Sequence, residues 1–350
     1  MKPTKPISLL WGLRSFCASH GCLYCYFGMI SAHREEMPTG PGVLSHLSPN
    51  DLTAADVLAF AKTLADSPVG RVFLAGGEPL LWKPILTLIE VLKAGGVEVV
   101  VCTSGVALNR PDLCEPLVEL GVDAVSVSLD SADPVHNDKW RPPHREGDGW
   151  EAVVSGISAL IKARGSGPRP KVGIYSVVTR RNLADIVAVP ELAAALGCDY
   201  AVPQPIALDP DHQLAAELSL TPDLLPELTA RFEELYAAEL PLVLPARAYA
   251  GQVASAVRRP TDLVPGCFGG DTLHFVQPDG TVWDCPSALR IAATPLERHR
   301  TIKGAAARDL FPDPTGCGTD CSLFSVDCVN MWPLTSFPVL APTGTETTRA

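Results

Sequence analysis

The sequence predicts an α/β protein in which helices cover a parallel β-sheet. Short apolar runs rich in β-branched residues alternate with longer amphipathic patterns along the first 210 residues. This alternation implies parallel strands joined by right-handed crossovers, so the sheet is either doubly wound or curled into a barrel. The chain of 350 residues is 47% hydrophobic and 19% charged, which is enough apolar material for a large core and one further unit.

Six strands and five following helices are expected in this part of the chain. The strands are the runs at residues 7–13, 71–75, 97–102, 124–129, 172–178 and 200–206. The helices are the amphipathic stretches 51–66, 84–96, 110–121, 149–165 and 183–197, of which the first is expected to start at Asn50 as its N-cap. Residues 211–265 form a Pro-punctuated helical bridge. Two short strands flank Pro278–Gly280, a hairpin signal.

Polar motifs follow the ends of these strands. Three cysteines come after the first strand, residues 76–79 (GGEP) after the second, residues 103–105 (TSG) after the third, and Asp130 after the fourth. In both candidate architectures the chemistry collects at the carboxyl ends of the strands. The sequence therefore predicts one functional site at this edge of the sheet.

Charge and hydropathy exclude several partners. The formal net charge of −11 disfavours nucleic acid, whose binding depends on Lys and Arg neutralising phosphates. No run reaches the roughly 18 apolar residues of a membrane helix, and the apolar stretch near the N-terminus is too short for a signal peptide. We therefore expect a cytoplasmic protein, where clustered cysteines more often bind metal or do redox chemistry than form disulfides.

The first cysteine group, Cys17, Cys22 and Cys25, has three possible explanations. The thiols could be buried in the core, although this loop rich in Gly and Ser offers little core to fill. They could bind zinc with His20 as a fourth ligand, although four ligands from nine residues are sterically awkward. Alternatively, three thiolates could hold a [4Fe-4S] cluster and leave one iron open for a small molecule.

The combination resembles the radical S-adenosylmethionine (radical SAM) enzymes. The resemblance rests on the three loop cysteines after strand one, Tyr24 before the last of them, and GGEP after strand two. It covers roughly residues 1–210 and implies a partial (β/α)6 TIM-like barrel. One departure is that four residues separate Cys17 from Cys22, whereas the family usually has three.

The resemblance also implies roles for individual residues. Cys17, Cys22 and Cys25 would ligate a [4Fe-4S] cluster whose open iron chelates the amine and carboxylate of S-adenosylmethionine. Further residues would bind this cofactor, among them the GGEP segment, which would meet the methionine amino group. They are Tyr24, Gly76, Gly77, Glu78, Pro79, Thr103, Ser128, Asp130 and Arg141. Asp130 as a helix cap and Arg141 as a solvated charge are the alternatives.

A second cysteine group lies near the C-terminus. Its first part resembles the opening of the SPASM and twitch extensions: twelve residues separate Cys267 from Gly280, and four separate Gly280 from Cys285. Three more cysteines follow, Cys317, Cys321 and Cys328. The resemblance implies a small cysteine-rich domain at residues 266–335 with one auxiliary [4Fe-4S] cluster and one spare thiol, followed by a disordered tail at 336–350. A zinc ribbon is the alternative.

The implied activity is formation of a 5′-deoxyadenosyl radical that abstracts hydrogen from a substrate. We expect a small carbohydrate, aminocyclitol or nucleoside-sugar intermediate of natural-product biosynthesis, undergoing dehydrogenation, epimerisation or decarboxylation as in cytosylglucuronate decarboxylation. Cys102 is a candidate hydrogen donor, and a flavodoxin- or ferredoxin-type protein would supply electrons. A peptide maturase is the alternative substrate class, and an iron-sulfur electron carrier or zinc-stabilised binding module is the alternative of another kind.

Overall fold

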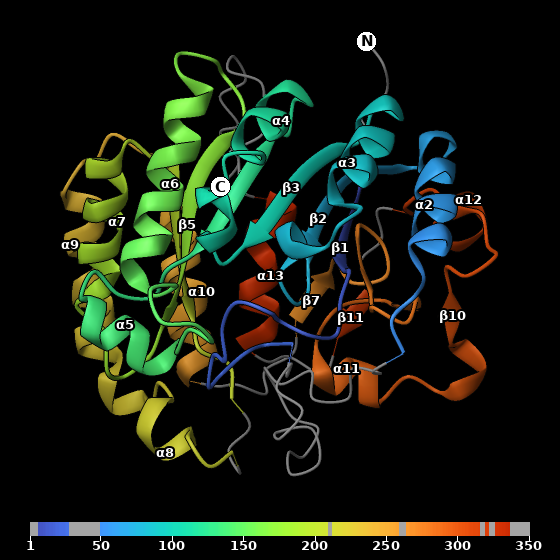
Figure 1. Ribbon diagram of the computed structural model, residues 1–350. Coiled ribbons are helices and arrows are strands. Elements are labelled where there is room, and N and C mark those ends of the chain that lie inside the picture. The colour runs from blue at the N-terminus through green and yellow to red at the C-terminus, as the bar shows by residue number, and fades with distance from the viewer. Residues whose placement is uncertain are drawn as a thin grey trace.

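The computed structural model of the protein is built around an open nine-stranded sheet (Figure 1). The structure describes residues 6–27, 50–208, 212–258, 264–315, 319–321 and 326–336. Six parallel strands form most of the sheet: β1 (Ile7–Gly12), β2 (Val69–Ala75), β3 (Glu98–Thr103), β4 (Ala124–Ser128), β5 (Lys171–Val178) and β6 (Tyr200–Pro205). They lie side by side in chain order, so the predicted αβ alternation and parallel sheet are confirmed.

The sheet curls without closing. Its edges are β6 and β10 (Arg300–Thr301), which corresponds to a partial (β/α)6 barrel rather than a complete one. The open side is where α13 (Val326–Ser336) lies: its Asn330 backbone carbonyl accepts a hydrogen bond from Gln204 of β6 at 3.0 Å. The barrel is thus partly filled by a helix from the far end of the chain.

The C-terminal hairpin is present but is joined to the main sheet. β8 (Leu273–Val276) and β9 (Thr281–Trp283) pair antiparallel around the predicted turn, and Gly280 takes a φ of 88° there. β8 also pairs in parallel with β1, which the sequence did not predict. A second, two-stranded sheet joins β7 (Val264–Cys267) to β11 (Thr319–Cys321). The boundary of a separate domain at residue 266 remains a prediction.

The helices form an outer layer around the sheet (Figure 1). After β1 to β5 come α2 (Ala54–Thr63), α3 (Ile85–Ala94), α4 (Cys114–Glu119), the pair α5 (Pro134–Trp140) and α6 (Trp150–Arg164), and α7 (Asp185–Leu196). The expected N-cap at Asn50 was wrong: Thr53 caps α2, because its Oγ1 accepts a hydrogen bond from the Asp56 backbone N–H at 3.2 Å.

The region predicted as a helical bridge consists of short and medium helices that pack on the outer layer. They are α8 (Ala215–Leu218), α9 (Leu225–Ala237) and α10 (Arg247–Arg258). Buried side chains of α9 and α10 share one apolar cluster with Ile186 and Val187 of α7. α11 (Ala288–Ala292) and α12 (Ala307–Leu310) follow the hairpin. The predicted tail lies outside the described residues, except for Ser336 at the end of α13.

Alternate residues of each strand face two different environments. In β3, Val99 and Val101 pack under the outer helices, whereas Val100 and Cys102 face the interior of the barrel. Leu10 is level with Phe73 of β2 on one side and with Phe275 of β8 on the other. Apart from Cys102, which is half-buried, these inward side chains are buried, and together they form the floor beneath the site described below.

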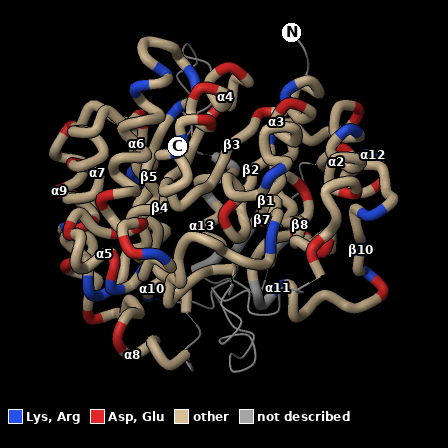
Figure 2. The backbone as a smooth tube through the Cα atoms, viewed as in Figure 1, with Lys and Arg blue, Asp and Glu red and all other residues tan. Residues whose placement is uncertain are grey.

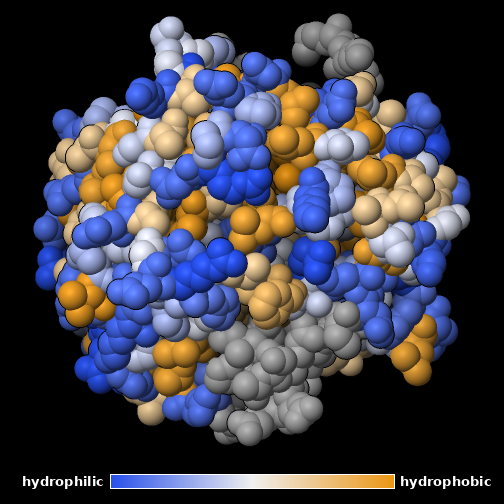
Figure 3. Space-filling model, viewed as in Figure 1, coloured by the Kyte–Doolittle hydropathy of each residue, from blue (hydrophilic) through white to orange (hydrophobic). Residues whose placement is uncertain are grey.

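The surface of the described part is polar with scattered apolar residues. Figure 2 shows acidic and basic side chains interspersed over the helices, and Figure 3 shows small apolar areas among hydrophilic ones on the same face. Among the residues that the structure describes, no helix combines the length and the apolar character needed to cross a bilayer.

Candidate active site

A mostly apolar cavity of about 260 Å³ lies at the carboxyl ends of the parallel strands. Inward-facing residues of the strands form its wall, the loop after β1 covers it, and α13 contributes Asn330, Met331 and Leu334. Of the residues that the sequence singles out for the first site, the wall includes Cys17, Cys22, Tyr24, Cys25, Gly76, Gly77, Cys102, Thr103, Ser128 and Arg141. Glu78, Pro79 and Asp130 lie behind the wall.

A backbone ladder holds the cysteine loop, Cys17–Cys25, in place. The Leu23 N–H donates to the Trp140 carbonyl at 3.0 Å and the Gly21 N–H to the Pro142 carbonyl at 2.8 Å. In the opposite direction, the His144 N–H donates to the Ser19 carbonyl at 2.9 Å. These three bonds tie the loop to the segment after α5, so the loop has a defined path although it contains little regular structure.

The three thiols of the loop interact with one another. Burial raises the pKa of Cys22 to about 12, Arg141 opposes this shift, and Cys25 and Cys17 add to it. Within the described part of the chain, no three His, Cys, Asp or Glu side chains have the geometry to hold a single metal ion. The three thiols nevertheless line one cavity.

The turn after β2 packs directly on the approach to the cysteine loop. Gly76 and Gly77 have φ values of 76° and 59°, a region that favours glycine. A Cβ on Gly77 would lie 2.2 Å from the carbonyl oxygen of Phe16, and one on Gly76 would lie 2.7 Å from the Cα of Gly12. The glycines are therefore required for contact between two backbone segments as well as for the cavity wall.

Glu78 faces away from the cavity. Its Oε1 accepts hydrogen bonds from the Thr103 hydroxyl at 2.7 Å and the Leu80 N–H at 3.0 Å, and its Oε2 accepts one from the Ser104 N–H at 2.7 Å. Pro79 is buried at the start of a short 3₁₀ helix, Pro79–Leu81. The carboxylate thus locks the turn after β2 to the end of β3, and the two glycines are the part of the GGEP segment that the cavity contacts.

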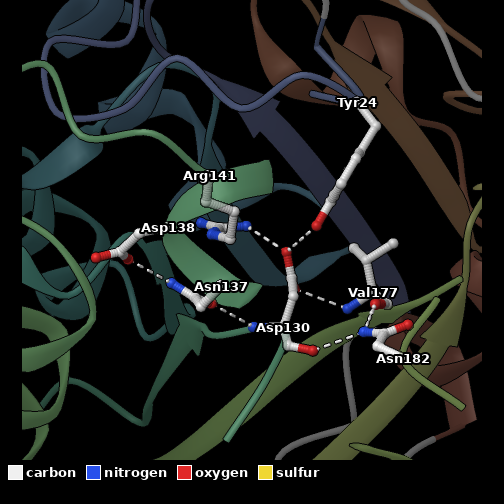
Figure 4. A network of polar contacts seen from close by, with 7 residues as sticks. All are labelled: Tyr24, Asp130, Asn137, Asp138, Arg141, Val177 and Asn182. Atoms are coloured by element: carbon white, nitrogen blue, oxygen red, sulfur yellow. Dashed lines mark hydrogen bonds and ion pairs between the residues drawn. The ribbon is translucent and has the colours of Figure 1, made fainter. Parts of the chain in front are cut away.

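Asp130 is the centre of a buried network beside the cysteine loop (Figure 4). Its Oδ2 accepts hydrogen bonds from the Tyr24 hydroxyl at 2.8 Å and from the Arg141 guanidinium at 3.1 Å. Its Oδ1 accepts one from the Val177 N–H at 2.8 Å, and its backbone carbonyl accepts one from Asn182 at 2.7 Å. The network joins the loop, β4 and β5, and it presents Arg141 rather than Asp130 to the cavity.

Cys102 and Ser128 enter the cavity from β3 and β4. Burial raises the pKa of Cys102 to about 12, and the charge of Glu78 adds to the shift, so the thiol stays protonated. Cys102 lines the same cavity as the three loop cysteines.

Among the polar residues of the cavity wall, Tyr175, Gln204 and Asn330 were missed by sequence reasoning, whereas His20, considered only as a zinc ligand, also lies there. Tyr175 and Gln204 could have been found, because they occupy inward positions near the ends of β5 and β6. Asn330 carried no signal, since only the docking of α13 brings it to the site. Its Nδ2 donates to the Pro205 carbonyl at 3.0 Å, and its buried Oδ1 has no partner among the described residues.

The second cysteine group also converges. Cys267, Cys285, Cys321 and Cys328 line a small cavity together with Arg290. The Gly269 N–H donates to the Cys267 sulfur at 3.4 Å. Cys317 lies outside the described residues. Met331 of α13 lines both this cavity and the larger one, and Cys328 lies on the same helix.

Relatives of known name share part of the sequence. An AdoMet-dependent heme synthase from Methanosarcina barkeri is 28% identical over 192 residues, which cover 55% of this chain and 48% of that protein. A probable GTP 3′,8-cyclase from Methanothermobacter thermautotrophicus is 30% identical over 141 residues, covering 40% and 39% of the two chains. Each match spans less than half of the relative's length.

Solved structures share the fold at low sequence identity. The structure of anSMEcpe with bound AdoMet matches with a TM-score of 0.62 and 16% identity, covering 96% of this chain and 98% of that one. Streptococcus suis SuiB bound to S-adenosylmethionine matches with a TM-score of 0.61 and 14% identity, covering 90% and 65%. Residues 15–193, just over half of the chain and including the cysteine loop and the turn after β2, match the Radical SAM superfamily. The protein therefore belongs to the radical SAM superfamily.

Proposed function

We propose that Cys17, Cys22 and Cys25 hold a [4Fe-4S] cluster that binds S-adenosylmethionine, and that the protein uses this pair for hydrogen abstraction. The observation that carries the proposal is that the three thiols and the Gly76–Gly77 turn surround one cavity at the carboxyl ends of the strands. When bound, the cluster and S-adenosylmethionine supply reductive cleavage to methionine and a 5′-deoxyadenosyl radical. The protein orients the reactants and excludes water.

The cavity residues divide the binding of S-adenosylmethionine among them. Arg141, held by Asp130, is a cation suited to the methionine carboxylate. Backbone carbonyls of the Gly76–Gly77 turn suit the ammonium group, because Glu78 directs its carboxylate at Thr103 and Ser104. In this scheme Asp130 and Glu78 are positioning residues.

We assign Cys267, Cys285, Cys321 and Cys328 to one auxiliary [4Fe-4S] cluster in a SPASM- or twitch-type domain. Four thiols around one small cavity supply a full set of cluster ligands. The amide hydrogen bond to the Cys267 sulfur is of the kind that tunes such clusters. Because Met331 contacts both cavities, this cluster would lie just behind the substrate and could accept an electron from it.

For the substrate we propose a small molecule rich in hydroxyl or amino groups: a carbohydrate, aminocyclitol or nucleoside sugar of natural-product biosynthesis. Asn330 lines a mostly apolar cavity, and its buried Oδ1 has no hydrogen-bond partner among the residues that the structure describes. The Gln204 Nε2 donates a hydrogen bond to the Asn330 backbone carbonyl, and the Gln204 Oε1 on the same amide is a second acceptor. Two acceptors on an apolar wall match a ligand that donates hydrogen bonds.

The net reaction is proposed to be a dehydrogenation, epimerisation or decarboxylation in the cytoplasm, with electrons from a flavodoxin- or ferredoxin-type protein. Cys102, a protonated thiol in the cavity wall, is placed to return a hydrogen atom to a substrate radical in the epimerisation case. The name GTP 3′,8-cyclase denotes a nucleotide substrate for that relative and is compatible with a ribose-containing substrate here.

Anaerobic reconstitution tests the proposal. About eight irons per chain and release of 5′-deoxyadenosine are expected. Four irons plus zinc would refute the auxiliary iron-sulfur cluster but not the radical chemistry. Zinc alone with no nucleoside release would refute the radical chemistry. Candidate substrates deuterated at carbon should then pass deuterium into 5′-deoxyadenosine; transfer only from a peptide would refute the small-molecule assignment.

A further inference from the structure

Arg290 is the one charged residue in the described lining of the second cysteine cavity. Four thiols surround this cavity, and its other described lining residues, which carry no charge, are Phe268, Ser287 and Met331. Arg290 lies on α11, which begins three residues after Cys285. A short segment of the chain therefore brings a thiol and a cation to the same cavity.

The protein supplies only part of a partner for the Arg290 guanidinium. One of its nitrogens lies 3.6 Å from Asp284 Oδ2, which is beyond hydrogen-bonding distance. The same carboxylate lies 2.8 Å from a nitrogen of Arg300 and 3.4 Å from one of Arg298. Three cations thus share one carboxylate, so the ion pair with Asp284 does not cancel the positive charge of Arg290.

The charge of Arg290 influences a sulfur atom of the cavity. It acts electrostatically on Cys267, and the Gly269 N–H donates a hydrogen bond to the same sulfur at 3.4 Å. Both interactions favour negative charge on the sulfur. Four thiolates and an iron-sulfur core form an anion that gains one further negative charge when it is reduced. A neighbouring cation therefore stabilises the reduced form more than the oxidised form.

We propose that Arg290 raises the reduction potential of the auxiliary cluster at Cys267, Cys285, Cys321 and Cys328. The proposal rests on the proposed function, since it needs the cluster on these four thiols. Arg290 acts through its charge and contributes no bond to iron. Asp284, which directly precedes Cys285, holds the guanidinium beside the cavity.

Three substitutions in the anaerobically reconstituted full chain test the role of this charge. Arg290→Met removes the charge and keeps a long side chain, and Arg290→Lys keeps the charge. Arg298→Met is the matched control, because Arg298 pairs with the same Asp284 carboxylate but is 60% exposed and does not line the cavity. Arg290→Gln replaces the methionine variant if that one does not fold.

The midpoint potential is measured by a redox titration followed by electron paramagnetic resonance. Cys17→Ala, Cys22→Ala and Cys25→Ala together remove the first cluster, so the remaining signal comes from the second site. If this background does not fold, the unsubstituted loop is kept, and the first cluster is identified by the change that S-adenosylmethionine causes in its signal. We expect Arg290→Met to lower the ratio of reduced to oxidised cluster about tenfold at a given potential, a shift of about 59 mV for one electron. Arg290→Lys and Arg298→Met should stay within about twofold.

Several results would overturn the proposal. An unchanged midpoint in Arg290→Met would make the arginine an ion-pair partner of Asp284 only, and equal shifts in Arg290→Met and Arg298→Met would assign the effect to the general charge of this surface. Second-site iron lost from both Arg290→Met and Arg290→Gln would make the arginine a structural residue. Zinc or no metal at the second site of the unsubstituted protein would overturn the auxiliary cluster as well, whereas iron and S-adenosylmethionine cleavage at the first site would be unaffected.

Discussion

Replacing Asp130 by alanine should destabilise the fold and loosen the cysteine loop. The side chains of Asp130 and Arg141 are only 2% and 10% exposed, so the substitution leaves a buried guanidinium without its carboxylate. Breaking a buried ion pair in this way costs about 3–5 kcal/mol. The Tyr24 hydroxyl and the Val177 N–H lose their acceptor too, and each buried unpaired donor adds about 1–3 kcal/mol.

The sum is at least about 5 kcal/mol, comparable with the whole stability of many domains. Circular dichroism melting of the apoprotein should therefore show a midpoint lower by about 5–10 °C. Iron incorporation at the first site should fall as well, because Tyr24 lies between two of its proposed ligands. Asp112→Ala is the control: its ion pair with Arg110 is short, 2.7 Å, but both side chains are exposed, so the midpoint should not move. A midpoint for Asp130→Ala within about 1 °C of the unsubstituted protein would refute the reasoning.

Three further results are expected. Gly77→Ala should lose the irons of the first site, because the new Cβ collides with a backbone carbonyl, while Gly96→Ala, which has a similar φ of 70° but open space, should keep them; equal iron contents would contradict this. Burial lowers the pKa of His274 to about 4. Between about pH 6.5 and pH 4 the imidazole is therefore protonated in the unfolded chain and neutral in the folded chain, so the free energy of unfolding should fall as the pH drops through this range. His274→Phe should flatten that slope in urea titrations, and an unchanged slope would show that other groups cause it. Cys285→Ser should remove about four irons and spare S-adenosylmethionine cleavage, whereas Cys198→Ser, a substitution in the apolar core, should leave the iron content of folded protein unchanged; retention of all irons by Cys285→Ser would exclude it as a ligand.

Local patterns were sufficient to predict the parallel strands. Each of the six strands begins and ends within about two residues of its apolar run, because strands buried on both faces leave a continuous apolar signature. The edge at which the polar motifs meet followed from parallel pairing alone. Ten residues expected at the first site do line one cavity, although their roles in binding remain predictions.

Features that depend on long-range docking were not predictable in this way. β8 pairs with β1 although more than 260 residues separate them, and no pattern in the sequence of either strand indicates which strand it pairs with. Likewise, the cavity wall contributed by Asn330 exists only because α13 packs on β6. The sequence also could not show that Glu78 turns towards β3, since a glutamate in a turn suits a ligand and a backbone N–H equally well.

The backbone ladder explains how the longer interval between the first two cysteines is accommodated. Ser19, His20 and Gly21 lie in register with residues 142–144, and their main-chain groups, not their side chains, make the pairing. The longer interval is thus held by backbone contacts around a single β-bridge. The path of the loop between Cys17 and Cys22 is consequently tied to residues 142–144, which are more than a hundred positions away in the sequence.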